Sequence, residues 1–496
     1  MSFAKLDELC RKLSAYDHAL SILFADEATN MPAGGGDARA AALSVLDSER
    51  HKLATQPVVA DWIEAARNEP LSEDQALALN ELARVYRNLI CLPTEFVERQ
   101  TRANLKCEQL WRTARAKADW AGIVPALSDV LSLVREEASR RAEALGVTPY
   151  DALMEKYDPG NRAAEITPVF DVLKRFLRDF IPGVVERQKS HLAKHPQREA
   201  RGPFPIEIQR ALGLEMMTAL GFDFDHGRLD ISHHPFCGGV PADVRMTTRY
   251  RTDEFITALM GILHETGHAL YEQGLPPEWH HWPLGLARGM AIHESQSLFV
   301  ERQIALNPSF WEWALPRAKA RIPQIAEWSV ADLLAHLHHV ERSLIRVDAD
   351  EVTYPLHVIL RYELEQELIA GRMQVKDLPE AWDAKMRDYL GLSTLADPAN
   401  AQMQDVHWHG GSFGYFPSYT LGALIAAQQW RAIGEEMPDI ERDFTRGDFS
   451  RVNDWRRQKI WRQASRQSTP DLIKSSTGRP LDAQIFISHL RARYAA

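Results

Sequence analysis

The chain has 496 residues, of which 45% are hydrophobic and 25% are charged, the balance of a globular protein that buries a large core. Its formal net charge of −10 argues against a general nucleic-acid binder or a membrane-surface binder, because both usually carry a basic excess. No apolar run reaches the roughly 18 residues that a membrane span needs. We therefore expect neither nucleic acid nor a membrane as a partner.

The first residues and the cysteines favour a cytoplasmic protein. The opening "MSFAKLDELCRKL" is charged and amphipathic, and it lacks the apolar stretch and small-residue cleavage site of a secretory signal. The cysteines are too few and too scattered for a disulfide framework or a zinc ribbon. Reduced, buried thiols are therefore expected at Cys10, Cys91, Cys107 and Cys237.

From residue 1 to about 195 the pattern is helical almost throughout. Stretches such as "QALALNELARVYRNLI" repeat apolar residues at spacings of three and four, which is typical of amphipathic helices. A segment rich in proline, glycine and charge, "KHPQREARGPFPIE" at 194–207, is the best candidate for a boundary.

A short β-hairpin or ribbon is predicted after one further helix. The stretches "GRLDISHHPF" and "DVRMTTRYR" alternate apolar and polar residues, and "CGGVPA" lies between them. His234 either lines a cleft here or is a structural residue in a turn set by Pro235.

The next helix, from about 253 to 274, carries two histidines on one face. Thr252 and Asp253 can cap its start, Gly274 can end it, and its wide apolar band predicts burial. His264 and His268, four apart, can present two imidazole nitrogens to one zinc ion at roughly 2.0–2.1 Å. Glu265, on a neighbouring face, could take a proton from the water that the ion activates.

A catalytic zinc needs a third protein ligand. The metzincin arrangement would require glycine at 271 and histidine at 274, but Tyr271 and Gly274 stand there. The alternative is a carboxylate on a second helix, and "HESQSLFVERQIAL" at 293–306 reads as one. Glu294 is the preferred ligand and Glu301 is its rival.

Further side chains are candidates for binding and polarising a peptide. A peptidase that acts at a free C-terminus needs a cation for the terminal carboxylate, and arginine suits this because its fork pairs two oxygens. The candidates are Arg245, Arg249 and Arg346. A loop rich in His, Trp, Tyr and Gly at about 392–419 offers donors for a developing oxyanion, namely His407 and either Tyr415 or Tyr419.

Six stretches in fixed order resemble the carboxypeptidase Taq family of metallocarboxypeptidases. They are "HPF" at 234–236, "DVRMT" at 243–247, "HETGH" at 264–268, "HESQ" at 293–296, "IRVDAD" at 345–350 and "QDVHW" at 404–408. One departure from the family pattern is Ala401, where the last motif usually opens with glycine.

The resemblance implies a mainly α fold with two helical lobes around a deep groove, similar to neurolysin and angiotensin-converting enzyme. It implies a single domain, with about 1–200 as a helical lid lobe and about 201–496 as the catalytic part, and a homodimer. The family uses zinc, with cobalt as a substitute, to release single C-terminal residues with broad specificity and poor action before proline. The "HPF" and "DVRMT" segments would close the groove.

Carried across by motif, the resemblance also assigns roles. The metal ligands would be His264, His268 and Glu294, the base Glu265, the carboxylate contact Arg346, and the transition-state donors His407 and Tyr415. An endopeptidase or dipeptidase of the same zinc class and an inactive peptide-binding scaffold stay open as alternatives.

Overall fold

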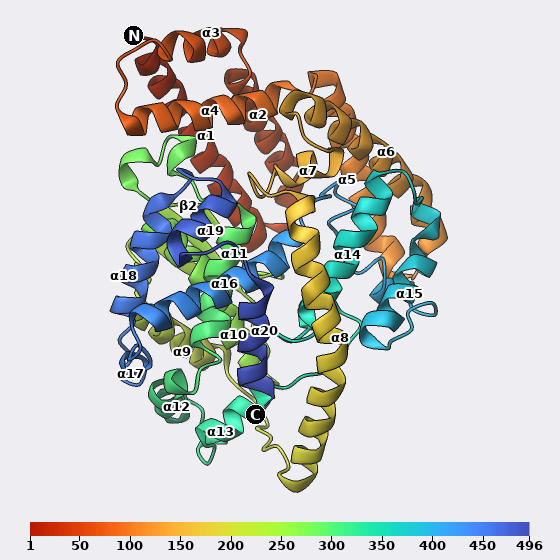
Figure 1. Cartoon of the computed structure of the whole chain (residues 1–496), viewed down its shortest axis with the longest axis vertical. Coiled ribbons are helices and arrows are strands. Elements are labelled where there is room, and N and C mark those ends of the chain that lie inside the picture. Colours follow the sequence, from red (N-terminus) through yellow and green to blue (C-terminus); the bar gives the residue numbers. More distant parts are fainter. Residues whose placement is uncertain (496) are drawn as a thin grey trace.

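The computed structural model describes residues 1–495, and most of them lie in helices (Figure 1). The helical pattern predicted up to about residue 195 is confirmed. Ser72 and Gln75 illustrate a local cause, since each side chain accepts the other's backbone N–H and so caps a helix start. The N-terminal helices are α1 (Ser2–Thr29), α2 (Gly36–Ala54), α3 (Pro57–Ala66), α4 (Glu73–Ile90), α5 (Thr94–Ala116), α6 (Trp120–Leu145), α7 (Pro149–Met154) and α8 (Ala163–Lys194).

A three-stranded sheet follows α9 (Ile206–Ala219). Its strands are β1 (Gly227–Ile231), β2 (Phe236–Val240) and β3 (Asp243–Thr248), in the order β1-β3-β2. The two predicted strands pair in parallel rather than as a hairpin. The segment expected to join them contains most of β2, which pairs antiparallel with β3. The glycines of "CGGVPA" hid this strand because glycine is rare in strand interiors.

Helices return in the C-terminal half, where α11 packs against both α10 and α16. The α11 helix continues into a π-helical segment, Phe299–Ile304. The helices are α10 (Ile256–Gly274), α11 (Met290–Leu298), α12 (Pro308–Arg321), α13 (Val330–Leu337), α14 (Tyr354–Ile369), α15 (Leu378–Leu390), α16 (Pro417–Glu436), α17 (Glu441–Phe444), α18 (Ser450–Lys459), α19 (Thr469–Thr477) and α20 (Ala483–Tyr494).

The start of α10 differs from the expected one. Thr252 and Asp253 do not cap it; the helix begins at Ile256, and the carboxylate of Glu254 accepts the backbone N–H of Thr257 at 3.0 Å. The Asp253 carboxylate is instead paired with the guanidinium of Arg251 at 2.5 and 2.9 Å. The predicted end at Gly274 is confirmed.

Two glycines allow α11 to pack closely on both neighbours. A Cβ atom on Gly267 of α10 would lie 2.3 Å from the carbonyl oxygen of Gln296, and one on Gly422 of α16 would lie 2.6 Å from Cγ of Glu294. Any larger residue at either position would push the helices apart. The close packing therefore fixes where Glu294 stands relative to α10.

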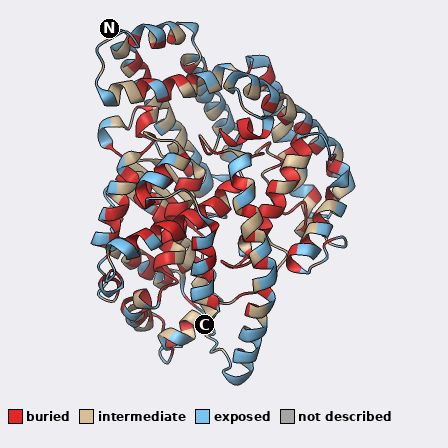
Figure 2. Ribbon diagram, viewed as in Figure 1, coloured by how far each residue is buried: buried red, intermediate tan, exposed pale blue. Residues whose placement is uncertain are grey.

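Buried residues form a large core and a smaller one. The large core extends through α5 to α20 and is densest around α10, α11 and α16 (Figure 2). The smaller core joins α1, α3 and α4 to Trp282 and Leu284, and the ring of Phe3 stacks on Trp282 at a centroid distance of 4.9 Å. The predicted division of the chain near residue 200 stays a prediction.

The cysteines and the helices bear on two other expectations. All four cysteines are free; Cys10 and Cys107 are buried as expected, whereas Cys91 and Cys237 are only half-buried. Among residues 1–495, no helix combines the length and the apolar character needed to cross a bilayer.

Candidate metal centre

A deep cavity of about 1660 Å³ runs between the N-terminal helices and the C-terminal half. The groove predicted with the mainly α fold is therefore confirmed. One wall comes from α1 and α4, and another from α10 and α11. The start of strand β2 contributes Phe236 and Cys237, preceded by Pro235. Helix α1 reaches the same sheet through a contact of 3.2 Å between His18 and Asp243.

The histidine pair of α10 faces a carboxylate of α11 in this cavity. Oε2 of Glu294 lies 3.8 Å from Nε2 of His264 and 3.5 Å from Nε2 of His268. The three ligand atoms all lie within 4.8 Å of one another. Two imidazoles and one carboxylate at such spacing suit a tetrahedral divalent ion with an open position. The three residues therefore fit a metal ion.

Glu301, the alternative to Glu294 as third ligand, contacts the outer ring nitrogen of His264. Its carboxylate lies 2.7 Å from Nδ1 of His264, so Nε2 is left to face the ion site. The guanidinium of Arg302 in turn contacts the other oxygen of Glu301 at 2.8 Å. A carboxylate at the outer nitrogen of a ligating histidine fixes its tautomer and strengthens it as a donor.

His268 is supported by a different arrangement. Its Nδ1 lies 2.6 Å from Nδ1 of His293, and Nε2 of His293 lies 2.7 Å from the carboxylate of Glu272. With Nε2 of His268 turned toward the ion site, the outer N–H of His268 donates to His293, and the N–H of His293 donates to Glu272. The outer nitrogen of His264 therefore contacts a carboxylate, whereas that of His268 contacts an imidazole.

Burial and facing charges set the protonation of these groups in the absence of an ion. Burial lowers the pKa of His264, but the carboxylates of Glu294 and Glu301 outweigh burial and raise it to about 9. Burial together with the neighbouring imidazoles lowers the pKa of His268 to about 4. Burial would raise the pKa of Glu294, yet the two histidines hold it at about 2. A divalent cation would take the place of the proton on His264.

Glu265 lies in the cavity wall beside the three ligands and is 7% exposed. Burial raises the pKa of its carboxyl to about 7, the nearby carboxylates add to this, and His264 opposes it. A carboxyl with a pKa near neutrality can both accept and return a proton at physiological pH.

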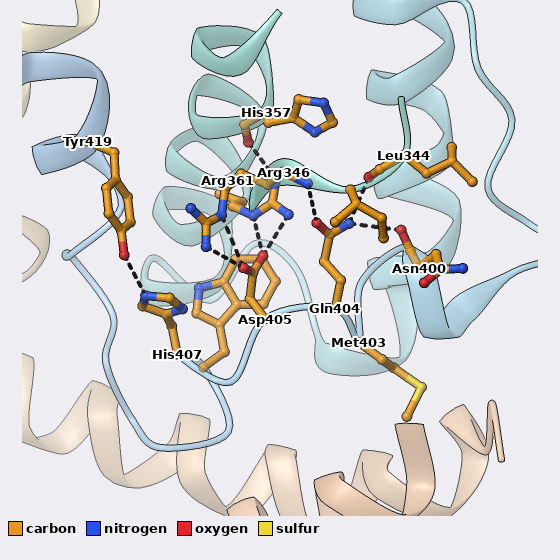
Figure 3. Close-up of polar contacts among 12 residues, drawn as sticks. Leu344, Arg346, His357, Arg361, Asn400, Met403, Gln404, Asp405, His407 and Tyr419 are labelled. Carbon is orange, nitrogen blue, oxygen red and sulfur yellow. Dashed lines mark hydrogen bonds and ion pairs between the residues drawn. The ribbon is translucent and has the colours of Figure 1, made fainter. Parts of the chain in front are cut away.

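Arg346 lines the cavity and is held by the "QDVHW" loop (Figure 3). Its guanidinium donates to Oδ1 of Asp405 at 2.8 and 3.1 Å and to the hydroxyl of Tyr354 at 2.8 Å. Gln404 accepts the backbone N–H of Arg346 at 2.8 Å. The second oxygen of Asp405 accepts from Nε of Arg361 at 2.7 Å.

Of the candidate donors to the oxyanion, the two tyrosines lie in the cavity lining and the histidine lies outside it. Tyr415 and Tyr419 line the cavity, whereas His407 is absent from its lining. Nε2 of His407 lies 3.1 Å from the hydroxyl of Tyr419, so the imidazole stands behind that tyrosine (Figure 3). Burial lowers the pKa of His407 to about 4. Ala401 at the start of this loop has a φ of −106°, which needs no glycine.

Three other candidates lie away from the cavity lining. Arg245 is paired with Asp243 at 2.5 and 2.9 Å. Arg249 and His234 are exposed. The backbone carbonyl of His234 accepts from the hydroxyl of Ser232 at 2.6 Å, which is a turn contact.

Sequence reasoning did not single out several residues that this site brings together. Three of them lie inside or beside the motifs quoted above, namely His293, Tyr354 and Asp405. Their polar side chains were the only feature of the sequence that pointed to a place in the site. Arg361 carries a weaker signal, a charge within the apolar run "HVILRYEL". Glu272, in the last turn of α10, lies against His293.

Comparison with known proteins identifies relatives along the whole chain. A family model described as "Carboxypeptidase Taq (M32) metallopeptidase" matches residues 5–494. Thermostable carboxypeptidase 1 of Thermus thermophilus is 39% identical, over 97% of this chain and 96% of that protein. Carboxypeptidase 1 of Bacillus subtilis is 34% identical, over 98% of this chain and 97% of that protein. The solved structure of Trypanosoma cruzi metallocarboxypeptidase 1 has a TM-score of 0.97 and 38% identity, over 100% of this chain and 99% of that one.

Proposed function

The chain belongs to the carboxypeptidase Taq (M32) family of metallopeptidases, and from this premise we propose that it releases single C-terminal residues from peptides at the site of His264, His268 and Glu294. The family makes it a metal-dependent peptide hydrolase. The observation that carries the proposal is the convergence of three ligand atoms within 4.8 Å in the wall of the deep cavity.

Zinc is the proposed ion, with cobalt as a substitute. Two imidazole nitrogens and one carboxylate oxygen form a donor set that zinc prefers, and cobalt accepts the same set. Bound to these side chains, the ion supplies Lewis acidity that acidifies a water molecule and polarises the scissile carbonyl.

Glu265 is the proposed general base. Its carboxylate accepts a proton from the attacking water and returns it to the leaving amine. The position of Glu265 next to His264 in the cavity wall supports both transfers. Nothing else in the "HETGH" motif can carry a proton without giving up an ion ligand.

Arg346 is the proposed contact for the substrate's terminal carboxylate. A guanidinium has five N–H groups, and three of those on Arg346 are used by Asp405 and Tyr354, which leaves one on each terminal nitrogen. These two can pair with the two oxygens of a carboxylate. Broad specificity and poor action before proline are carried over from the family.

Tyr419 or Tyr415 is the proposed donor to the developing oxyanion. Both line the cavity, whereas His407 is absent from its lining and contacts the hydroxyl of Tyr419 at 3.1 Å. His407 is therefore proposed to orient Tyr419 rather than to donate directly. The homodimer and the cytoplasmic location stay predictions.

A pair of matched peptides tests the exopeptidase function. The zinc-loaded chain is incubated with a blocked tripeptide that has a free C-terminal carboxylate and with its C-terminal amide. We expect release of the last residue from the first peptide alone. Cleavage of the amide at a comparable rate would favour the endopeptidase alternative, and bound zinc without hydrolysis of either peptide would favour the inactive scaffold.

A further inference from the structure

Two buried arginines share a single carboxylate at the wall of the cavity. Asp405 accepts from Arg346 through one oxygen and from Arg361 through the other (Figure 3). The ion-pair distances are 2.8 Å to Arg346 and 2.6 Å to Arg361. The group therefore holds two positive charges and one negative charge.

Arg361 has no access to a substrate. Its side chain is 0% exposed, and it is not part of the cavity lining, in contrast to Arg346. Its guanidinium lies over the ring of Trp382 at 4.5 Å and donates to the backbone carbonyl of His357 at 2.7 Å. The hydrogen-bonded link between Arg361 and Arg346 runs through Asp405.

The surrounding groups do not remove the surplus positive charge. His357 and His407, both beside the arginines, have pKa values lowered by burial to about 3 and about 4, and so are neutral. Glu365, four residues after Arg361 on α14, has a pKa that burial raises to about 7. Its hydrogen bonds go to Tyr150, Trp408 and Gly414, and none goes to either arginine.

We propose that Arg361 is a positioning residue for substrate binding: its buried charge offsets that of Asp405, so that Arg346 faces the cavity with a net positive charge and selects a free carboxylate. This inference rests on the proposed role of Arg346. Without Arg361, Asp405 and Arg346 would form a neutral pair, and a neutral pair attracts an anion far less than a lone cation does. With Arg361, Asp405 can hold the fork of Arg346 in place without cancelling its charge.

The cost of burial argues that the second arginine serves more than packing. An unbalanced buried charge is unfavourable, and apolar residues of similar volume often replace buried ion pairs without loss of stability. The pocket of Trp382 and Phe416 around Arg361 could hold a methionine side chain. Packing against Trp382 and Phe416 alone would not require the charge.

The test compares Arg361→Met with Arg361→Lys in the full-length, zinc-loaded chain. We expect Arg361→Met to raise KM for a blocked dipeptide ending in leucine about tenfold, with kcat changed less than twofold. N-acetyl-leucine and N-acetyl-leucinamide serve as competitive inhibitors. The ratio of their inhibition constants should fall about tenfold toward unity in Arg361→Met and stay near the wild-type ratio in Arg361→Lys, which keeps the charge.

The remaining outcomes decide against the proposal. An unchanged ratio in Arg361→Met, with KM also unchanged, means that the buried charge has no part in binding. If Arg361→Met and Arg361→Gln both fail to fold while Arg361→Lys folds, the charge serves folding and the proposal is wrong. Arg346→Met distinguishes a failure of the proposed function from a failure of this inference. If Arg346→Met leaves the ratio of inhibition constants unchanged, the proposed role of Arg346 itself is wrong. If Arg346→Met changes the ratio and Arg361→Met does not, only the inference about Arg361 is wrong.

Discussion

Nε2 of His407 lies 3.1 Å from the hydroxyl oxygen of Tyr419, and of the two side chains only Tyr419 lines the cavity. The imidazole can therefore influence a bound peptide through the tyrosine hydroxyl. The "QDVHW" loop thus contacts two residues of the cavity lining: His407 contacts Tyr419, and Asp405 accepts from Arg346.

The pairing predicts a non-additive effect of substitution. Tyr419→Phe should lower kcat about 10²-fold, because one donor to the oxyanion is lost. His407→Ala should lower kcat roughly tenfold alone and have no further effect in the Tyr419→Phe background. Steady-state kinetics of the four proteins check this. If Tyr415→Phe carries the large loss and Tyr419→Phe does not, the donor is Tyr415.

Replacement of the proposed base should separate catalysis from metal binding. Glu265→Gln keeps the size of the side chain but removes its proton acceptor, so kcat should fall about 10³-fold. Zinc content, measured by atomic absorption, should stay at one ion per chain, because Glu265 is not among the three converging ligands. Glu278→Gln, at an exposed glutamate beyond the end of α10, is the control. Full activity of Glu265→Gln would refute the assignment.

The contacts at the outer nitrogens of His264 and His268 predict that two glutamate substitutions weaken zinc binding to different extents. Glu301→Gln should weaken zinc binding about 10- to 100-fold, because its carboxylate contacts His264 directly at 2.7 Å. Glu272→Gln should weaken zinc binding less, since Glu272 reaches His268 only through His293. Competition with a chromophoric chelator measures both. Equal affinities in the two variants and the wild type would show that these contacts do not tune the site.

Gly422 predicts a steric effect on the third ligand. In Gly422→Ala the new Cβ would lie 2.6 Å from Cγ of Glu294, so the carboxylate must shift and zinc affinity should fall at least tenfold. Gly434→Ala is the matched control on the same helix, because nothing lies within 4 Å of its added Cβ. That variant should bind zinc normally and be more stable by up to about 1 kcal/mol. Normal zinc affinity in Gly422→Ala would mean that α11 adapts.

A buried carboxylate in α6 predicts how stability depends on pH. Glu137 is 2% exposed, and although burial alone would raise its pKa, Lys156 and Arg141 lower it to about 2. Because the folded pKa lies below the unfolded one, the stabilisation is complete above about pH 4.5 and is lost as the pH falls toward 2. Glu137→Gln should lower the free energy of unfolding by about 3 kcal/mol at pH 7.

Urea denaturation at two pH values checks the sign of this effect. The difference between wild type and Glu137→Gln should shrink by roughly 1 kcal/mol from pH 7 to pH 4. Glu136→Gln, at a neighbouring exposed ion pair, should change stability by less than about 1 kcal/mol at either pH. A difference that grows on acidification would contradict the lowered pKa.

Local patterns were sufficient for most helices and for the placement of the two proposed histidine ligands on one helix face. Helical periodicity placed His264 and His268 on one face because residues four apart always lie so in an α-helix. The same reasoning failed at the sheet, where parallel pairing of β1 with β3 depends on a crossover that periodicity cannot show. It also failed at the start of α10, where an ion pair between Arg251 and Asp253 removed the expected cap.

What the sequence determined is the chemistry of the centre, because two imidazoles and the adjacent Glu265 come from a single stretch of helix whose geometry is local. The tertiary structure decided the use of the remaining polar groups. Glu294 and Glu301 lie on one continuous segment, and only the packing of α11 against α10 and α16 places the first at the ion site and the second behind His264. The tertiary structure also decides which arginine is fixed at the cavity, because a loop distant in the chain brings Asp405 into contact with Arg346. Contacts between residues far apart in the chain cannot be read from motif spacing.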